Sequence, residues 1–467
     1  MSLAADSPVH SSSSDDFAAF LDAELKSAST SEEEASPDQD NVSNDDDDND
    51  DDYLKEARIK RRKVCESEVI DESQGSTSVG AMQEELVTSQ APIDEICPHP
   101  GFIRDMCIRC GKLKDDYAGV AFGYIHKDLK LGAEEIARLR GADLKNLLRD
   151  RKLYLVLDLD HTLLNSTRLI DTLPEENYLI NQADPVEDGL RNSIFKLDHM
   201  HMLTKLRPYV HTFLKEASSM FEMYVYTMAE RSYALEMAKL LDPGHMYFSS
   251  RIISQADCTT RHQKGLDVVL GAESAVVILD DTEIVWQKHK ENLILMERYH
   301  FFASSSRQFG FNGRSLSELR RDESEADGVL AAVLKVLKRV HQMFFDPDDG
   351  MDVSSRDVRK LLSMVRREIF SGCKLVFSRV FPTKFQAENH QLWKMAEQLG
   401  ATCSTELEPS VTHVVATDSG TEKARWAVQQ GKFLVHPRWI EAAHYLWQRQ
   451  PEEGYPVESQ PKVKNLP

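Results

Sequence analysis

The stretch Leu153–Leu164 (LYLVLDLDHTLL) decides the fold of this chain. Its first five residues are all apolar, and such an unbroken run is typical of a strand covered on both faces, as in a parallel sheet. Asp158 and Asp160 follow the run directly. Because ligands of open parallel sheets bind at the carboxyl ends of the strands, the sequence predicts that these aspartates face a site.

Two carboxylates at this spacing can divide the work of phosphoryl transfer. Asp158 can attack phosphorus in line, while Asp160 protonates the departing alkoxide and later takes a proton from water. A bare pair of aspartates can equally cap the loop after a strand without a catalytic role. Thr162 and the downstream segments favour the catalytic interpretation.

Length and composition indicate a globular chain of two or three domains, since 467 residues with 41% hydrophobic content can fill that many cores. No apolar stretch approaches the roughly 18 residues needed to cross a bilayer, and the polar start does not resemble a secretion signal. Seven scattered Cys favour a reducing compartment over a disulfide scaffold.

The formal charge of −21 is concentrated at the N-terminus, where residues 1–53 hold seventeen Asp and Glu against one Lys. We expect residues 1–90 to form a disordered acidic tail, because such segments bury too little apolar surface to offset the entropy of ordering. The tail suits basic protein partners and repels nucleic acid, or it serves only solubility. The basic cluster Arg58–Lys63 within it is typical of a nuclear import signal.

A candidate zinc knuckle precedes the catalytic region, within residues 91–115. Three thiols and an imidazole, which suit tetrahedral zinc, are supplied by Cys97, His99, Cys107 and Cys110. The C-x-H half is tighter than usual zinc spacings, so this half is expected to be strained. The alternative is a loop of reduced cysteines without metal.

Two further predicted strands end in polar residues. The strand Phe221–Tyr226 delivers Thr227 before a helix expected to begin near Ala229, and the strand Ala275–Leu279 delivers Asp280 and Asp281. Strands alternate here with helical patterns, which predicts an α/β doubly wound parallel sheet over residues 145–310. The polar strand ends should therefore meet at one edge.

The chemistry of phosphoryl transfer predicts a role for each of these residues. A carboxylate of Asp158, Asp281 and the backbone carbonyl of Asp160 can hold Mg²⁺, which prefers oxygen ligands. Thr227 can donate to phosphate oxygens beside a helix N-terminus. Lys264, expected one short helix before the third strand, can balance the charge. Asp280 is expected to orient this lysine or the waters of the metal.

These motifs together resemble the haloacid-dehalogenase-like superfamily, whose DxDxT form, here Asp158 to Thr162, is associated with phosphatases and phosphotransferases. The segments Thr204–Leu214 (TKLRPYVHTFL) and Asp280–Trp286 (DDTEIVW) are similar to its FCP/SCP branch, and His161 in the first motif is similar to plant members. That branch removes phosphate from Ser in the C-terminal heptad repeats of RNA polymerase II.

The resemblance implies a nuclear, Mg²⁺-dependent protein-serine phosphatase that regulates transcription through an aspartyl-phosphate at Asp158. Mn²⁺ or Co²⁺ could substitute for Mg²⁺, and general transcription factors are expected partners. Only about forty residues separate Asn165 from Thr204, too few for a large domain closing over the site. An open cleft favours a phosphorylated chain over a small metabolite.

The C-terminal part is predicted to form a second domain. Helical patterns over residues 325–370 indicate a connector, and from Ser371 short strands alternate with helices. The order over residues 371–460 resembles a BRCT domain, a small α/β fold marked here by Leu399–Ala401, Thr412–Val415 and Trp439.

Some BRCT domains bind phosphoserine, and the matching positions here are Ser378, Thr421 and Lys423. Arg379 stands where phosphate-binding members usually carry Gly, which limits access to the backbone donor. A lone BRCT domain can instead serve as a protein-docking module.

Two other functions compete with the phosphatase. The first is a non-catalytic adaptor, whose BRCT domain and acidic tail bind phosphoproteins of the transcription machinery beside a vestigial phosphatase fold. The intact set of acidic residues argues against it. The second is hydrolysis of a nucleic-acid 3′-phosphate, against which the acidic tail and the lack of a basic, aromatic-laced patch argue.

Overall fold

The structure, a computed structural model, describes residues 97–114, 117–180, 193–311, 313–346, 353–382 and 384–458. The predicted acidic tail and its basic cluster lie outside these residues. Within the described ranges, no helix is both long and apolar enough to cross a membrane.

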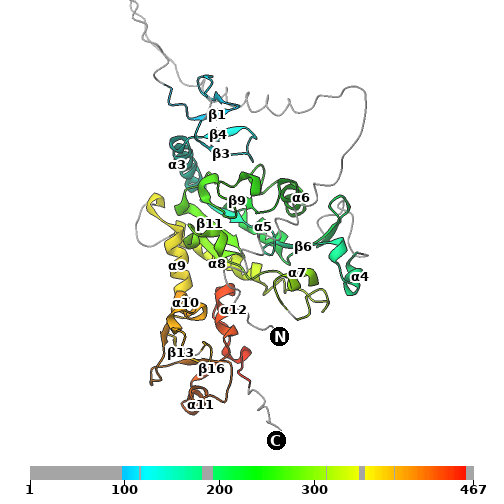
Figure 1. Cartoon of the computed structure of the whole chain (residues 1–467). Coiled ribbons are helices and arrows are strands. Elements are labelled where there is room, and N and C mark those ends of the chain that lie inside the picture. The colour runs from blue at the N-terminus through cyan, green and yellow to red at the C-terminus, as the bar shows by residue number, and fades with distance from the viewer. Residues whose placement is uncertain are drawn as a thin grey trace, which may run out of the picture. The chain divides into compact units, whose positions relative to one another are not determined.

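A five-stranded parallel sheet forms the centre of the predicted catalytic region (Figure 1). Its strand order is β10-β9-β5-β11-β12, with β5 in the middle. The strands are β5 (Leu153–Leu157), β9 (Phe221–Tyr226), β10 (Ile252–Ile253), β11 (Val276–Asp280) and β12 (Leu293–Leu295). The chain adds β9 and β10 on one side of β5 and then β11 and β12 on the other, so the order reverses at β5. This reversal is where α/β sheets bind ligands.

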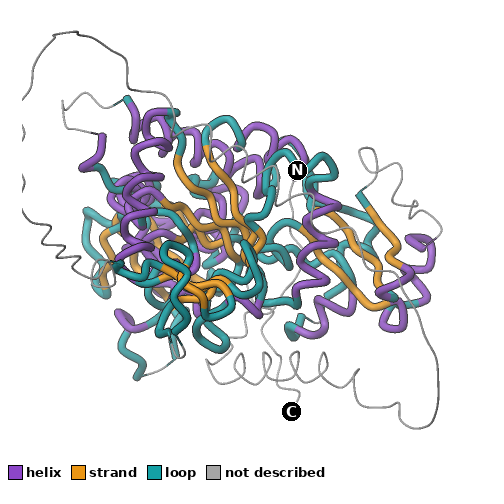
Figure 2. The backbone as a smooth tube through the Cα atoms, turned by 90° about the horizontal axis from the view of Figure 1, so that it is seen from above, coloured by secondary structure: helices purple, strands orange, loops and turns teal. Residues whose placement is uncertain are grey.

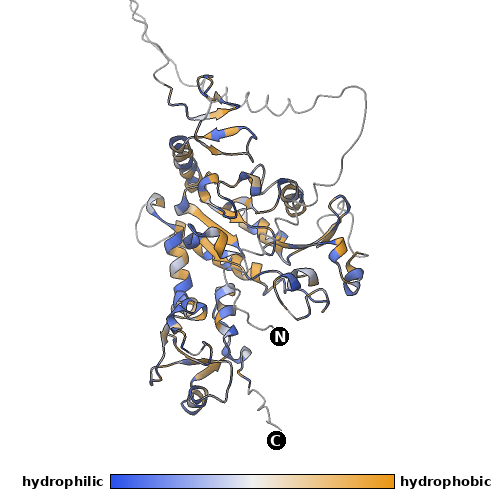
Figure 3. Ribbon diagram, in the orientation of Figure 1, coloured by the Kyte–Doolittle hydropathy of each residue, from blue (hydrophilic) through white to orange (hydrophobic). Residues whose placement is uncertain are grey.

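The sheet is buried on both faces, as the apolar runs predict. Alternate residues of each strand enter opposite cores: Leu155 joins the core built with α5, α6, α8 and α9, and Val156 joins the core built with α3. These helices are α3 (Ala133–Arg149), α5 (Val210–Ala217), α6 (Arg231–Leu241), α8 (Val329–Phe345) and α9 (Val358–Glu368). Figure 2 shows helices beside the strands, and Figure 3 shows the strands of this sheet as hydrophobic.

A three-stranded antiparallel sheet of order β6-β8-β7 follows the first two aspartates. Its strands are β6 (Leu164–Arg168), β7 (Ile194–Leu197) and β8 (Met202–Leu206), and the short helix α4 (Asn177–Ile180) lies between β6 and β7 in the chain. These few residues make a small insertion, in agreement with the predicted absence of a large enclosing domain.

A second antiparallel sheet lies at the start of the described chain, with order β2-β1-β4-β3. Its strands are β1 (Gly101–Ile103), β2 (Met106–Cys107), β3 (Val120–Ala121) and β4 (Leu129–Leu131). Gly101 permits the close approach of β1 to β4, because a Cβ there would lie 2.8 Å from the carbonyl oxygen of Lys130. The chain passes from β4 directly into α3.

The C-terminal domain has a four-stranded parallel sheet of order β14-β13-β15-β16. Its elements are β13 (Lys374–Ser378), α10 (Gln391–Gln398), β14 (Thr402–Ser404), β15 (His413–Ala416), α11 (Glu422–Gln429), β16 (Phe433–Val435) and α12 (Arg438–Leu446). Trp439 is fully buried and stacks on Phe370, with ring centroids 4.3 Å apart. The predicted fold class, a parallel α/β domain followed by a smaller α/β domain, is confirmed.

Most remaining loops hold 3₁₀ turns, and one short helix, α7 (Ala303–Gln308), follows β12. Three 3₁₀ helices matter for the site: η7 (Leu266–Val268), η8 (Glu273–Ala275) and η9 (Glu283–Trp286).

Candidate active site

The register of the parallel sheet brings the predicted acidic residues to one edge. Leu157 pairs with Leu279 of β11 on one side and with Val225 of β9 on the other. The next residues along each strand are therefore neighbours at the carboxyl edge. Asp158 continues the ladder through its backbone N–H, which donates to Leu279 O at 3.0 Å.

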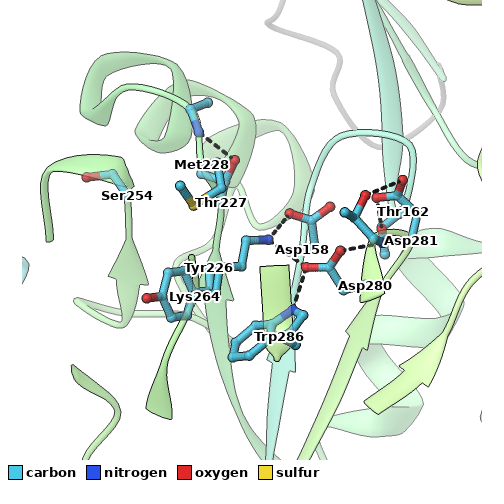
Figure 4. Close-up of polar contacts among 12 residues, drawn as sticks. Asp158, Thr162, Tyr226, Thr227, Met228, Ser254, Lys264, Asp280, Asp281 and Trp286 are labelled. Carbon is cyan, nitrogen blue, oxygen red and sulfur yellow. Dashed lines mark hydrogen bonds and ion pairs between the residues drawn. The ribbon is translucent and has the colours of Figure 1, made fainter. Parts of the chain in front are cut away.

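Lys264 joins two of these carboxylates. Its Nζ donates to Oδ1 of Asp158 at 2.5 Å and to Oδ2 of Asp280 at 2.6 Å (Figure 4). All three side chains are buried. A cation between two buried carboxylates is a preorganised charge cluster of the kind that phosphoryl transfer requires.

Burial and mutual charge control the protonation of this cluster. Burial raises the pKa of Asp158 well above its usual value; Lys264 opposes this rise, whereas Asp280 adds to it. Burial alone would lower the pKa of Lys264, but the two carboxylates outweigh it and raise that pKa. Lys264 therefore remains a cation at neutral pH and favours the charged form of the carboxylate it contacts.

The segment that carries Lys264 differs from expectation. The prediction of one short helix between Lys264 and the third strand is wrong, because the chain forms two 3₁₀ turns, η7 and η8, instead. The backbone N–H of Lys264 donates to Val285 O at 2.9 Å. This bond ties the start of the segment to η9.

Asp281 completes a cluster of three carboxylates. One oxygen each of Asp158, Asp280 and Asp281 lies within 4.8 Å of the others, close enough to share a cation. Oδ2 of Asp281 accepts a hydrogen bond from Arg298 Nε at 2.6 Å and another from Thr282 Oγ1 at 3.0 Å. Burial opposes the change, but Arg298 and His161 hold the pKa of Asp281 below its usual value. Arg298, which follows β12 without any motif around it, was not predicted.

Asp160 lies on the turn that follows β5. His161 has φ +61, which reverses the chain so that its N–H donates to Leu164 O at 2.8 Å. The carboxylate of Asp160 accepts a short 2.5 Å hydrogen bond from the Tyr233 hydroxyl of α6. Sequence reasoning missed Tyr233, because a tyrosine inside an amphipathic helix gives no signal of this contact.

Thr227 follows β9 as predicted, but the helix after it starts later than Ala229. The hydroxyl of Thr227 accepts from the Ala229 N–H at 3.0 Å, so a side-chain turn precedes the helix, and α6 begins at Arg231. Figure 4 shows Thr227 on the Lys264 side of Asp158. The contact that it makes is with its own turn, so its role toward phosphate stays a prediction.

The four candidate zinc ligands also come together. Cys97 Sγ and Cys107 Sγ lie 3.9 Å apart, and Cys110 Sγ lies 3.5 Å from His99 Nδ1. All four ligand atoms lie within 4.8 Å of one another. The strain expected in the C-x-H half is visible at His99, whose φ of +46 is unusual for a residue with a side chain.

The three candidate phosphate ligands of the C-terminal domain are neighbours too. Ser378 Oγ donates to Thr421 Oγ1 at 2.8 Å, and both side chains are buried. Lys423 is directed to the backbone, where Nζ donates to Thr405 O at 2.7 Å. Arg379 has φ +55, which lies in the left-handed region of backbone conformation. Glycine adopts this conformation more easily than a residue with a side chain. The ammonium group of Lys423 thus already binds a backbone carbonyl of this domain.

Comparisons with known proteins agree with this geometry. Residues 153–321 match the NLI interacting factor-like phosphatase family, and residues 365–443 match the BRCA1 C Terminus (BRCT) domain. The chain is 56% identical to RNA polymerase II C-terminal domain phosphatase-like 4 of Arabidopsis thaliana, over 98% of each chain.

The chain belongs to the RNA polymerase II C-terminal domain phosphatase family. A second Arabidopsis thaliana relative, C-terminal domain phosphatase-like 3, is 42% identical over 71% of this chain and 27% of its own length. The solved structure of Fcp1, an essential RNA polymerase II CTD phosphatase, aligns with a TM-score of 0.54 and 25% identity, covering 69% of this chain and all of that one.

A structure of an arginine-to-alanine variant of fission yeast Fcp1, bound to beryllium fluoride, aligns with a TM-score of 0.53 and 26% identity, again covering 69% of this chain and all of that one. Membership of this family confirms the FCP-type phosphatase resemblance stated from the four motifs and the BRCT domain.

Proposed function

We propose that this protein is a Mg²⁺-dependent phosphatase that removes phosphate from serine in the C-terminal heptad repeats of RNA polymerase II. The observation that carries the proposal is the contact of Lys264 with both Asp158 and Asp280 at the carboxyl edge of the sheet. The relative that matches over 98% of each chain, named RNA polymerase II C-terminal domain phosphatase-like 4, supports the substrate.

In the first step an oxygen of Asp158 forms a bond to phosphorus while the bond from phosphorus to the serine Oγ breaks. Asp160 gives its proton to the departing Oγ. In the second step Asp160 takes a proton from water, the hydroxide attacks phosphorus, and phosphate leaves as the Asp158 carboxylate is restored. Tyr233 would orient Asp160 throughout through its 2.5 Å hydrogen bond.

Mg²⁺ would be held by Asp158, Asp281 and the backbone carbonyl of Asp160, with Asp280 beside it, and the three clustered carboxylates fit such an ion. When bound, the ion supplies positive charge that lets the carboxylate approach an anionic phosphate; Mn²⁺ or Co²⁺ could replace it. Lys264 supplies further positive charge. Thr227 would donate its hydroxyl proton to phosphate, since its oxygen already accepts from Ala229 N–H.

A pocket lined by sequence neighbours of Thr227 and Lys264 supports a chain as substrate. Met228 follows Thr227 in sequence and His262 lies two residues before Lys264, and both line this pocket together with Cys258 and Arg261. The residue next to the phosphoserine could enter it. Among the residues that the structure describes, the insertion after Asp160 is small and forms no large covering domain.

The remaining parts would serve recruitment. We propose a phosphatase domain over residues 145–310, a helical connector over 325–370 and a BRCT domain over 371–460 that captures the substrate or docks a protein partner. The acidic tail within residues 1–90 would contact basic partners, such as general transcription factors. The basic cluster Arg58–Lys63 would direct the protein to the nucleus. We propose no direct contact with nucleic acid.

The test is hydrolysis of p-nitrophenyl phosphate and of heptad peptides phosphorylated at defined serines, with and without Mg²⁺. Asp158→Asn should abolish both activities, whereas Asp327→Asn, at an exposed aspartate outside the site, should keep them. An inactive wild-type protein that still binds phosphorylated heptads would support the adaptor function instead. Activity on a nucleic-acid 3′-phosphate but not on the peptides would overturn the proposed substrate.

We also propose Zn²⁺ as the ion of the Cys97, His99, Cys107 and Cys110 cluster, because three thiolates and one imidazole form a common structural zinc set.

A further inference from the structure

Two pairs of ligand atoms in the candidate zinc cluster lie at the separations that a tetrahedral zinc ion would impose. With Zn–S bonds of about 2.3 Å and Zn–N bonds of about 2.05 Å, tetrahedral geometry places two sulfurs about 3.8 Å apart and a sulfur about 3.6 Å from the nitrogen. The observed pairs lie at 3.9 Å for Cys97 and Cys107, and at 3.5 Å for Cys110 and His99. The sulfurs are too far apart for a disulfide.

The backbone around Cys107 forms a turn that presents both thiols of the C-x-x-C pair to one point. The N–H of Arg109 donates to Cys107 Sγ at 3.4 Å, and the N–H of Gly111 donates to Cys107 O at 3.0 Å. Gly111 has φ +74, which closes the turn at little cost for glycine. An N–H aimed at a sulfur favours the thiolate that zinc binds.

The sheet beside these ligands, which carries Cys107 on β2, has little core of its own. Its four strands are two or three residues long, and few of their side chains are buried, chiefly Phe102, Cys107 and Leu131. Strands this short, with so few buried side chains, bury little apolar surface, so a further cross-link would stabilise the sheet. A bound metal can supply that cross-link, because its binding free energy adds to the folding free energy.

The sheet β2-β1-β4-β3, its loops and α3 together form what we call the module. The module also contacts residues 266–269, the segment that follows Lys264, the proposed catalytic lysine. Tyr124 donates its hydroxyl proton to Val268 O at 2.8 Å, and Arg140 of α3 donates from Nε to Val269 O at 3.1 Å. Arg140 also contacts the carbonyl oxygen of Leu266. Leu131 and Ile136 share one hydrophobic core with this segment. The segment itself forms a 3₁₀ turn, and these contacts restrain it together with the hydrogen bond that the Leu266 N–H donates to His289 Nε2 at 3.3 Å.

We propose that one zinc ion bound by Cys97, His99, Cys107 and Cys110 locks the sheet β2-β1-β4-β3, and that this zinc-locked module braces the segment 266–269 behind Lys264. The module is thus a structural part of the phosphatase rather than a separate binding unit. The consequence for catalysis rests on the proposed role of Lys264, but zinc binding and the brace do not.

The test uses the full chain, purified without chelator. Elemental analysis should find about one zinc per chain. Cys110→Ser should lose the zinc, and because Cys110 is exposed this change removes little packing. Hydrogen exchange of the backbone amides in residues 266–269 should then become faster by about tenfold or more. Cys403→Ser, at a cysteine of β14 in the other domain, should keep both zinc and protection.

Wild-type protein without zinc, or a Cys110→Ser protein that keeps its zinc, would overturn the metal site. Loss of zinc with unchanged exchange over residues 266–269 would overturn the brace. If Cys110→Ser does not fold, zinc is removed from wild-type protein with a chelator and the same exchange is measured. Asp158→Asn should be inactive yet retain zinc, so a failure of the proposed phosphatase function is distinguished from a failure of this inference.

Discussion

The indole Nε1 of Trp286 donates to Oδ2 of Asp280 at 2.8 Å, and this is the same oxygen that accepts from Lys264. Trp286 is fully buried and therefore holds the carboxylate in one orientation. Asp280 in turn receives the Thr282 N–H on its other oxygen at 2.8 Å. Asp280 is thus placed by three donors and itself positions Lys264.

Trp286→Phe keeps most of the buried ring but removes this donor. A hydrogen bond to a charged group contributes about 1.5–3 kcal/mol, so we expect kcat to fall by about ten- to a hundredfold while KM changes little. Steady-state hydrolysis of a phosphorylated heptad peptide measures this. Unchanged kcat in a folded variant would show that the orientation of Asp280 does not matter.

Tyr233→Phe removes the hydroxyl that donates to Asp160, the residue that we propose transfers a proton in both steps. We expect kcat to fall by about tenfold or more, the low end of the effect of a positioned acid–base group. If the second step slows more, the phosphorylated enzyme should accumulate, which rapid quenching with ³²P-labelled substrate would detect. Tyr247→Phe, at a half-buried tyrosine outside the site, is the matched control.

Arg207 ties the turn after β5 to the segment before α8. Its guanidinium makes two hydrogen bonds to Glu323, at 2.7 and 2.9 Å, and a third to Thr162 O at 3.0 Å, and it is fully buried. Arg207→Ala leaves Glu323 without this partner, so unfolding should become easier by about 3–5 kcal/mol.

Denaturant unfolding of the full chain measures this loss. The matched control is Arg168→Ala, which breaks the exposed pair with Asp171 and should change stability by less than about 1 kcal/mol. Equal effects of the two substitutions would contradict the prediction.

His444 of α12 should make the protein sensitive to acid. Burial and the nearby charge of Arg366 lower the pKa of its imidazole to about 4. An unfolded histidine titrates near 6.5, so between about pH 6.5 and pH 4 the unfolded chain binds more protons than the folded one. Stability should therefore be lost as pH falls through this window, by up to about 3 kcal/mol for this residue.

His444→Gln should lose less stability between pH 7.5 and pH 5 than the wild type, measured by thermal unfolding at each pH. His199→Gln, at an exposed histidine, should behave as the wild type. An identical pH dependence in all three proteins would rule out His444 as a source of the acid sensitivity.

The central strands could be predicted because their signals are local. The run before Asp158 is apolar at every position, and a strand with that pattern must be covered on both faces, which a parallel sheet between helices provides. The same reasoning located β9 and β11, and thereby the edge where Asp158, Asp280 and Asp281 meet. Residue order and polarity were sufficient for this part of the site.

The contacts that orient these residues could not be predicted. Tyr233 reaches Asp160 across 73 positions of sequence, and Arg140 reaches the segment behind Lys264 across more than 120. The late start of α6 also depended on a contact, because the Thr227 hydroxyl captures the N–H of Ala229.

Local pattern thus decided which residues form strands and which acids end them, since periodicity and side-chain chemistry act over a few neighbouring positions. Tertiary structure alone decided which partner each acid received: Lys264 for Asp158, Tyr233 for Asp160 and Arg298 for Asp281. The reason is that such contacts depend on the path of the backbone between distant elements, and packing of the whole core sets that path.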